Sequence, residues 1–468
     1  MGNQRSLIKS LGLGYVIILV VANIIGSGVF KKIAPMADEL HSSSWILIAW
    51  LVGGIITLLG ALSYAEVGGL LADTGGDFVY LKKIYNKFIS FIYGWSLFTV
   101  IGSATLSSLA YVFAQSLNSI VPVPDVLKSL QDFTIGGVFY PFQDFGIKLT
   151  AILLIMVLTY LNIRGLKGGA RVSRALLITV CAGLFVIIIF GLGSKASEPV
   201  RLYDLNKLTP GTVTISSFYT AMLATFWAYQ GWASVGFIGG EVKNPTINIP
   251  RGIVIGVFIT IIFYLLANAT YLSIMSIPQL VDVQNAGNQI AGVEAVRIFW
   301  GTKGVLFISL LILVSTVDCA NATMLTGARP FYAMAREGLF FASVGKLNRK
   351  NVPANSLLWQ GVWASVLVLS GTFDQLTDML IFAVYIFYGA VAIGVFVLRK
   401  KMPDAHRPYK VWGYPVIPAL FILFCIGLFF NTIITRPRES AIGLSLILLG
   451  IPVYYFLRWR YSKKSVRS

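Results

Sequence analysis

The sequence predicts an all-α integral membrane protein in which about twelve helices cross the bilayer, and three observations lead to this fold class. Hydrophobic residues make up 56% of the 468-residue chain and charged residues only 12%, whereas a soluble protein carries roughly 25% charged residues. Apolar runs of about 20 residues, long enough to cross a ~30 Å hydrocarbon core, recur along the whole chain. No polar stretch is long enough for a soluble domain, so residues 1–468 are predicted to form a single membrane domain.

The predicted spans follow one another with mostly short polar connections. They cover residues 12–33, 44–70, 88–118, 145–163, 172–193, 214–240, 250–274, 303–328, 356–371, 376–398, 412–434 and 441–457. The two longest connections, near residues 119–144 and 275–302, are predicted to be external loops with short amphipathic helices. The first span has no small-residue cleavage site and exceeds signal-peptide length, so it is predicted to remain as a helix.

The distribution of positive charge predicts the orientation of the chain. When the N-terminus and every second loop are assigned to one side, most of the 37 lysine and arginine residues fall on that side. By the positive-inside rule both termini are then cytoplasmic. The net charge of +18 is explained by this asymmetry, and no basic face or aromatic-lined groove accompanies it. We therefore expect the lipid bilayer as the surroundings and no nucleic acid as a partner.

Two of the predicted spans contain glycine-rich interruptions. One is Asn23-Ile-Ile-Gly-Ser-Gly-Val-Phe30 in the first span, and the other is Phe226-Trp-Ala-Tyr-Gln-Gly-Trp232 in the sixth, with Gly231 as its flexible point. Glycine in a helix interior costs roughly 1 kcal/mol relative to alanine, and unwound backbone at membrane depth is tolerated only where it lines a cavity or is buried in protein. Two interrupted helices five spans apart are typical of an inverted-repeat transporter.

Each interruption exposes main-chain groups near the middle of the membrane. Helix N-termini attract anions, and free carbonyl groups attract cations. An α-amino acid carries both charges about 3 Å apart, close to the spacing of neighbouring backbone groups. The alternative is that Gly26 and Gly28 only allow neighbouring helices to pack closely. The presence of a second interruption favours a binding site.

Eight short motifs, distributed from about residue 10 to residue 420, carry a family resemblance. They are Asn23-Ile-Ile-Gly-Ser-Gly-Val-Phe30, Ala61-Leu-Ser-Tyr-Ala-Glu-Val67, Gly75-Gly76-Asp77, Asn162-Ile-Arg-Gly-Leu-Lys167, Ala228-Tyr-Gln-Gly-Trp232, Glu241-Val-Lys-Asn-Pro245 with Ile249-Pro-Arg251, Arg329-Pro-Phe-Tyr-Ala-Met-Ala-Arg-Glu-Gly338 and Arg407-Pro-Tyr-Lys410. In this order they resemble the amino acid–polyamine–organocation superfamily, and most closely its L-type amino acid transporter branch among prokaryotes. A single motif is weak, but the ordered set is specific.

The resemblance implies a leucine-transporter-type fold that works by alternating access. The first five-helix repeat would cover residues 12–193, the inverted second repeat residues 214–398, and two additional helices residues 412–457. It also implies a multi-pass protein of the plasma (inner) membrane. The substrate would be a small or medium neutral L-amino acid, carried either by cation-coupled symport or by exchange.

The resemblance further implies which residues bind the substrate. The carboxylate would meet the N–H groups of Ser27 and Gly28, and the ammonium would meet the carbonyls near Ile24 and Trp227. Trp227 would also act as a gate that closes over the substrate from outside. The full predicted substrate-binding set is Ile24, Gly26, Ser27, Gly28, Trp227, Ala228, Tyr229, Gln230 and Gly231.

The sequence departs from the family in two places. Members that pair with a glycoprotein subunit carry a cysteine in the loop after the third helix, but residues 119–144 contain none. A disulfide-linked heavy subunit is therefore not expected. Many members carry a lysine in the fifth helix whose ammonium occupies the place of a sodium ion, and Val180 stands at that position here.

Carboxylates within spans are costly, at least ~2.5 kcal/mol on insertion scales, and so mark candidate functional positions. Asp318 shares one face of the eighth span with Ser315 and Cys319 through i, i+3, i+4 spacing. In the implied fold this face meets the carbonyls of Ala22 and Ile25, which would complete an oxygen-rich site for sodium or a proton. A structural hydrogen bond to a neighbouring helix is the alternative. No other metal site and no cofactor are predicted.

Glu66, near the cytoplasmic end of the second span, is interpreted as structural or gate-associated, with an arginine or lysine of a nearby loop as its partner. A polyamine carrier on the same fold remains an alternative function, although few acidic groups are expected in an external cavity. A nutrient sensor would need an added soluble domain. An enzyme is disfavoured because His41 and His406 are isolated loop residues and no metal cluster or nucleophile–base pair is present.

Overall fold

The computed structural model describes residues 11–71, 76–136, 139–165, 169–203, 213–235, 242–350 and 352–465. Of the motif residues, Gly75, Leu166, Lys167 and Glu241 lie outside these ranges. The described residues form an all-helical bundle, as predicted, with isolated β-bridges such as that between Leu11 and Val242.

The helices of the first half are arranged in the order of the predicted spans. Their bounds are α1 Leu13–Ile24, α2 Gly28–Lys31, α3 Ile33–Leu40, α4 Ser43–Leu70, α5 Asp77–Ile84, α6 Lys87–Ser96, the π-helical η1 Leu97–Ile101, α7 Gly102–Asn118, the 3₁₀ turn η2 Lys128–Leu130, α8 Phe145–Ile163, α9 Gly169–Leu192 and the 3₁₀ turn η3 Pro199–Leu202.

The second half adds the remaining helices. Their bounds are α10 Ile215–Ala228, α11 Pro245–Ile274, α12 Ile277–Ala286, α13 Ala291–Arg336, α14 Ala354–Ser370, α15 Phe373–Lys401, α16 Val416–Thr435, α17 Pro437–Leu448 and α18 Gly450–Ser465. The long α13 is kinked at Gly301, whose φ is 62°, so its first turns lie in the predicted external loop.

Ten of the twelve predicted spans correspond to helices long and apolar enough to cross a membrane, within the described part of the chain. The other two are the sixth and ninth predicted spans. The sixth is interrupted after the 14-residue α10, and α14 has 17 residues. The short length of α10 follows from the break at its C-terminal end.

Side-chain caps fix where several helices begin. Ser42 accepts a hydrogen bond from the Trp45 N–H at the start of α4, and Asn86 accepts two at the start of α6. Capping boxes built on Thr214 and Thr372 start α10 and α15. Because each cap satisfies N–H groups that the helix leaves free, polar residues sit where the apolar runs begin.

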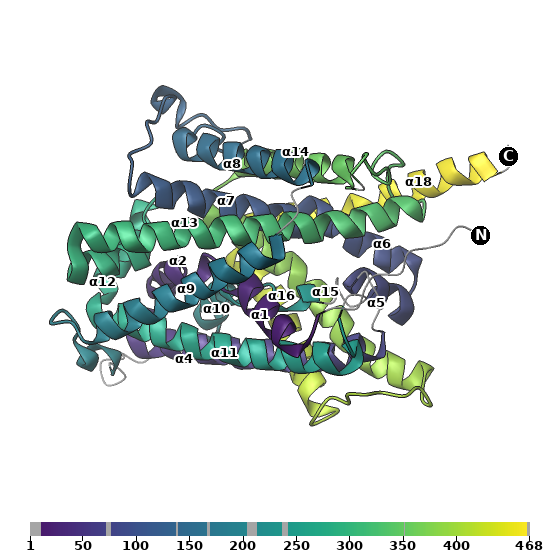
Figure 1. The fold of residues 1–468 in the computed structure, drawn as a ribbon, viewed down its shortest axis with the longest axis horizontal. Helices are drawn as coiled ribbons and strands as arrows, with labels where there is room; N and C mark the ends of the chain where they lie inside the picture. Colours follow the sequence, from purple (N-terminus) through teal and green to yellow (C-terminus); the bar gives the residue numbers. More distant parts are fainter. Residues whose placement is uncertain are drawn as a thin grey trace.

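The helices run along the long axis of the bundle (Figure 1). Helices α4 and α11 lie side by side along one flank, and α8 and α14 along another (Figure 1). The helix α11 also packs against α1, where Gly252 and Gly256 face Val16 and Val20 so closely that a Cβ on either glycine would overlap them. This small-xxx-small spacing allows two helices to approach closely in a membrane.

The two ends of the bundle carry different elements. Helices α5 and α18 lie toward one end and α12 lies at the other (Figure 1). The positive-inside rule assigns the α5 end to the cytoplasm. We call these ends the predicted cytoplasmic end and the predicted external end.

Glu66 anchors the predicted cytoplasmic end, and the expected arginine partner is present. Its carboxylate, 2% exposed, receives two hydrogen bonds from Arg399, at 2.9 and 2.7 Å. Arg407 of the following loop lies 3.5 Å away, and the Val411 N–H donates a third hydrogen bond at 2.7 Å. Bidentate pairing of this kind is strong, so Glu66 fastens the loop that carries the Arg407-Pro-Tyr-Lys410 motif.

Candidate functional site

The first span is interrupted where the sequence predicts it. Helix α1 ends at Ile24, and the short α2 begins at Gly28. Between them the Gly26 N–H bonds to the Ile24 carbonyl at 2.8 Å. Among the described residues, the N–H groups of Ser27 and Gly28 have no hydrogen-bond acceptor. Two donors are therefore free at the beginning of α2.

The second interruption lies at the end of α10. The helix stops at Ala228, Tyr229 and Gln230 form a turn, and Gly231 adopts a φ of 118°. A 3₁₀ turn follows over residues 232–235. Because L side chains rarely adopt this φ, glycine is required at position 231.

The two interruptions are in direct contact. A Cβ on Gly231 would overlap the Asn23 carbonyl, and a Cβ on Gly28 would lie 2.5 Å from the Ala228 Cα. The backbones therefore touch without intervening side chains, which brings free main-chain groups of α1, α2 and α10 to one place.

A cavity of about 110 Å³ lies beside this contact. Its walls come from the two interruptions and from α7, η1 and α13. The lining residues are Asn23, Ile24, Gly26, Ser27, Gly28, Leu97, Ile101, Gly102, Thr105, Leu109, Trp227, Gln230, Gly231, Ser234, Cys319, Thr323, Thr326 and Gly327. Seven of the nine predicted substrate-binding residues are among them. Ala228 and Tyr229 instead lie buried behind the wall.

Two polar side-chain atoms of the cavity lining are buried without a hydrogen-bond partner in the described structure. They are the Ser27 hydroxyl and the Trp227 indole N–H. Such atoms cost free energy unless a ligand or water satisfies them. With the free N–H groups of Ser27 and Gly28, they give the cavity unsatisfied donors on one side.

Trp227 also closes the cavity toward the predicted external end. Its ring packs edge-to-face against Phe373 at a centroid distance of 5.8 Å. The ammonium of Lys32 lies 4.6 Å from the centre of the Phe373 ring, a cation–π contact. Lys31, 5.1 Å from the same ring, also donates to Gln115 at 2.8 Å. The two aromatic rings and the two lysines form a continuous lid.

A second, polar cavity of about 340 Å³ lies beyond this lid. Four carboxylates line it, those of Glu39, Asp374, Asp378 and Glu439. The expectation of few acidic groups on this side was therefore wrong. The reason is that α3 ends, and α15 and α17 begin, at the same place although they are separated in sequence.

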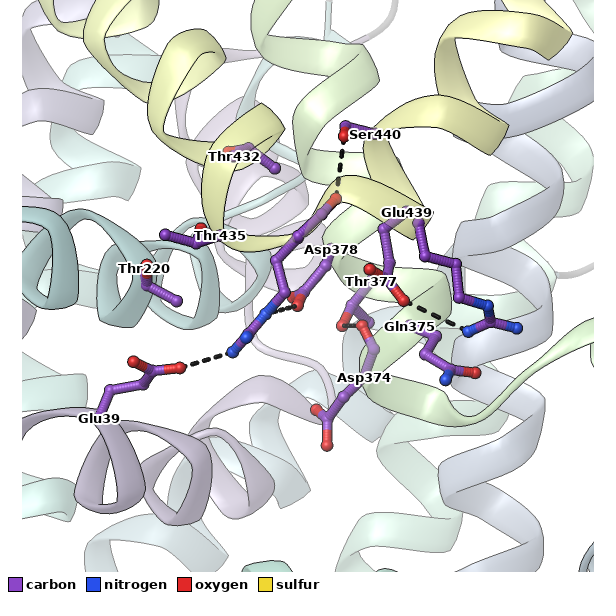
Figure 2. A network of polar contacts seen from close by, with 12 residues as sticks. Glu39, Thr220, Asp374, Gln375, Thr377, Asp378, Thr432, Thr435, Glu439 and Ser440 are labelled. Carbon is purple, nitrogen blue, oxygen red and sulfur yellow. Dashed lines mark hydrogen bonds and ion pairs between the residues drawn. The ribbon is translucent and has the colours of Figure 1, made fainter. Parts of the chain in front are cut away.

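These carboxylates are paired with cations. Lys32, 1% exposed, lies 2.7 Å from Asp374, and Arg436 lies 2.6 Å from Glu39 and 3.2 Å from Asp378. Glu39 and Asp378 approach this one guanidinium from two helices (Figure 2). The pairs link α2, α3, α15 and the beginning of α17 and keep the predicted external end closed.

Tyr264 of α11 is a site residue that the sequence did not reveal. Its hydroxyl lies 2.8 Å from the Ile24 carbonyl and 2.8 Å from the Ala228 carbonyl, and the residue is fully buried. A hydroxyl has one proton, so it donates to only one of these carbonyls at a time. Tyr264 thus connects both interruptions. A tyrosine within an apolar run gives no sequence signal that separates this role from ordinary packing.

The predicted cation-site residues lie on α1 and α13, beside the first interruption. The Ser315 hydroxyl donates to the Ile25 carbonyl at 3.3 Å, and the Cys319 thiol points to the Asn23 carbonyl at 3.9 Å. Asp318 is half-buried on the same helix. Ala22 lies in the preceding turn of α1. The structure thus brings Ser315 and Cys319 to the main chain at the interruption.

The sequence is similar to those of known proteins over most of its length. Residues 11–457 match the model of a family described as amino acid permease. The chain is 32% identical over 464 residues to the serine/threonine exchanger SteT of Bacillus subtilis (strain 168), covering 98% of each chain.

Two human proteins are also similar. The b(0,+)-type amino acid transporter 1 is 28% identical over 462 residues, covering 97% of this chain and 89% of its own length. The large neutral amino acids transporter small subunit 2 is 29% identical over 476 residues, covering 99% and 83% respectively. The similarity in each case extends over nearly the whole of this chain.

Proposed function

Since the chain belongs to the amino acid permease family and is an amino acid transporter, we propose that it carries small neutral L-amino acids by alternating access, with exchange as the main mode. The single observation that supports the substrate assignment most strongly is the pair of touching helix interruptions beside a cavity. The proposed fold is the inverted-repeat arrangement in which such interruptions occur at corresponding places of two halves.

The substrate carboxylate binds to the N–H groups of Ser27 and Gly28. These donors have no acceptor among the described residues, and they lie at the N-terminal side of α2, where a helix favours negative charge. The Ser27 hydroxyl, also unpartnered, supplies a third donor. A carboxylate accepts several such bonds at once.

The substrate ammonium binds to carbonyl oxygens of the same interruptions. The Ile24 carbonyl lines the cavity side and shares the Tyr264 hydroxyl with Ala228. The Ile24 carbonyl also accepts the Gly26 N–H at 2.8 Å. The arriving ammonium therefore takes the lone pair of Ile24 that stays free while Tyr264 donates to Ala228. The Trp227 carbonyl, which accepts one bond from the Gln230 N–H at 3.1 Å, retains a second lone pair.

The cavity favours a small, uncharged side chain. None of the lining residues is Lys, Arg, Asp or Glu, so a charged side chain would be desolvated without a partner. The volume of about 110 Å³ is below the roughly 150 Å³ of an engineered protein cavity that holds benzene. Thr105, Thr323 and Thr326 give part of the wall hydroxyl oxygens that can accept a hydrogen bond from the side chain of serine or threonine.

The direction of access follows from the lid. In this structure the predicted external end is closed by Trp227, Phe373 and the Lys32–Asp374 pair. Gly327, which also lines the cavity, lies in the last turns of α13, the part of this helix that runs to the predicted cytoplasmic end. These contacts support a state closed to the outside, from which transport requires the lid to separate. The protein is proposed to reside in a bacterial plasma membrane with cytoplasmic termini and without a disulfide-linked subunit.

Cation-coupled symport is the second candidate, and the position of Ser315 favours it. The Ser315 hydroxyl and the Ile25 carbonyl already lie within 3.3 Å. With Asp318 and the Ala22 carbonyl they would provide oxygen ligands for sodium or bind a proton. Val180, 2% exposed on α9, cannot supply the fixed charge that a lysine would.

Transport by purified protein in proteoliposomes tests the proposal. Vesicles loaded with unlabelled serine should accumulate labelled serine, and a panel of competitors should show alanine, serine and threonine competing and arginine and glutamate not competing. Strong competition by putrescine or spermidine instead would favour a polyamine carrier and contradict the neutral substrate.

The two transport modes are separated with the same vesicles. Exchange predicts that uptake requires an internal amino acid and is unchanged by sodium or proton gradients in both the protein and its Asp318→Asn variant. Symport predicts gradient-driven uptake into empty vesicles that Asp318→Asn abolishes. A Ser315→Ala variant serves as the second test of the cation site.

A further inference from the structure

A buried carboxyl without a cationic partner lies near the predicted cytoplasmic end. Asp77 is the first residue of α5 and is 2% exposed. One of its oxygens accepts a hydrogen bond from the Tyr93 hydroxyl at 3.2 Å. Its other oxygen has no hydrogen-bond partner, and no described lysine, arginine or histidine forms an ion pair with it. Asp77 thus differs from Glu66, which has two arginine partners.

Among the described residues, the titratable side chains that face Asp77 come from the neighbouring helices and are tyrosines. Tyr64 of α4, Tyr93 of α6 and Tyr388 of α15 surround it. The Tyr64 hydroxyl is buried and also makes no hydrogen bond. A carboxylate in such surroundings is desolvated with the Tyr93 hydrogen bond as compensation on one oxygen and no cation to balance its charge among the described residues, whereas a protonated carboxyl has an O–H that can satisfy a neighbouring oxygen.

This tyrosine shell is connected to the substrate cavity. The Tyr64 ring packs edge-to-face on Trp232 at 4.8 Å and on Tyr388 at 5.4 Å. We call Tyr64, Trp232 and Tyr388 the aromatic cluster. The Tyr388 hydroxyl donates to the Gln230 side chain at 3.3 Å, and Gln230 lines the cavity. Trp232 immediately follows Gly231, so the cluster supports the second interruption directly.

We propose that Asp77 is a proton-binding site, and that its protonated form stabilises the aromatic cluster that supports the second helix interruption. The carboxylate takes one proton from water and becomes a neutral carboxyl whose O–H faces the Tyr64 hydroxyl. The Tyr93 hydroxyl continues to donate to the other oxygen. Loss of the proton leaves a buried charge and favours hydration of the site, which separates α5 from the cluster.

The pKa of Asp77 agrees with this geometry. Burial raises it to about 7, while the Tyr93 and Tyr64 hydroxyls act to lower it. A hydrated Asp77 would have the ordinary value of about 3.9. Between about pH 4 and pH 7 the buried arrangement therefore binds one more proton than the hydrated one, so its stability falls as the pH rises through this window and levels off above about pH 7.

The proton site is measured directly by infrared spectroscopy of the full-length protein in lipid. The difference spectrum between the unmodified protein and Asp77→Asn should contain a protonated-carboxyl C=O band that titrates with a midpoint near pH 7. Tyr93→Phe keeps the ring but removes the donor to the carboxylate, so the midpoint should move to higher pH. Absence of the band near neutral pH would overturn the proposal, and this readout does not depend on transport.

The effect on the cavity is tested by exchange, and this part rests on the proposed transport function. The exchange rate should change several-fold between about pH 6 and about pH 8 inside the vesicles, and Asp77→Asn should remove this dependence. Asp404→Asn, which removes an exposed carboxylate from a loop at the same end, is the matched control and should retain the profile. An unchanged profile in Asp77→Asn, together with a present infrared band, would refute the coupling to the cavity.

If the unmodified protein exchanges no amino acid, the proposed transport function is refuted. The infrared result then still tests whether Asp77 binds a proton. If Asp77→Asn does not fold, the Tyr93→Phe midpoint decides it instead. An unmoved midpoint in Tyr93→Phe would contradict the placement of the proton on Asp77.

Discussion

The two ends of the substrate cavity differ in how their buried carboxyl groups are paired. Toward the predicted external end, the carboxylates of Glu39, Asp374 and Asp378 are each paired with Lys32 or Arg436. Toward the predicted cytoplasmic end, Glu66 is likewise paired with Arg399, but Asp77 is buried beside tyrosine hydroxyls and pairs with no cation among the described residues. Ion pairs respond to salt and to mutation of one partner, whereas an isolated buried carboxyl responds to pH. We therefore expect ion pairs to stabilise both ends, and Asp77 to add a response to pH at the predicted cytoplasmic end.

Between these ends, the contact of the two interruptions should be the most sensitive point. Gly231→Ala would force an L side chain into a φ of 118° and into the Asn23 carbonyl. Displacement by about 1 Å in a binding site costs on the order of a hundredfold, so exchange of labelled serine should fall by at least about that factor. Gly287→Ala also changes a glycine with positive φ, but in open space, and should leave exchange nearly intact. Equal effects of the two variants would contradict the role of the contact.

The ion pair of Glu66 at the predicted cytoplasmic end should have the next largest effect, on stability. Glu66→Gln leaves Arg399 without its bidentate partner in a largely buried site. Removing one partner of a fully buried pair costs 3–5 kcal/mol. Because Arg399 is partly exposed, we expect about 2 kcal/mol. Thermal unfolding in detergent measures this loss as a lowered Tm. Glu294→Gln removes an exposed pair with Arg297, and its Tm should change little.

Tyr264→Phe should reduce binding without unfolding the protein. The change removes the buried hydroxyl that donates a hydrogen bond to the carbonyl of Ile24 or Ala228. Tyr264 holds the carbonyls of the two interruptions in place for the ammonium, and loss of this preorganisation should weaken the affinity for serine about tenfold. Equilibrium binding of labelled serine checks this value. An affinity equal to that of the unmodified protein would show that Tyr264 only fills space.

Weakening the ion pairs at the predicted external end should have the smallest effect, an increase in the rate at which the cavity becomes accessible from outside. Lys32→Gln weakens the link to Asp374 and should let the lid open more often. In a background with Cys181 and Cys425 replaced by serine, Cys319 should then react several-fold faster with an impermeant thiol reagent added outside. Lys82→Gln breaks an exposed pair with Glu337 at the other end and should not change this rate. Slower labelling in Lys32→Gln would contradict the lid assignment.

Much of the fold was predictable because the bilayer imposes simple rules. Apolar runs predict spans, and interior glycines at positions 26, 28 and 231 predict the interruptions, since unwound backbone is expensive in lipid. The structure confirms both breaks. The sixth predicted span does not correspond to a single long helix, because the break at its middle leaves only the short α10.

The parts of the site that the sequence did not predict depend on contacts between residues far apart in the chain, which sequence spacing does not reveal. Tyr264 lies 240 positions from the Ile24 carbonyl that it contacts, and Asp374 lies 342 positions from Lys32. Asp77 was noticed only as part of a motif, since its lack of a cation is a property of the packed helices. The unexpected carboxylates of the external cavity have the same origin.

The central claim is that free main-chain groups bind both the carboxylate and the ammonium of the amino acid. Binding measurements with analogues that lack one of these two charges test it most directly. Serine, serinamide and N-acetylserine should be compared as competitors of labelled serine on the purified protein. The account predicts that serine competes and that neither analogue does, because one lacks the carboxylate for Ser27 and Gly28 and the other lacks the ammonium. Competition by serinamide or N-acetylserine at the same concentration as serine would contradict it.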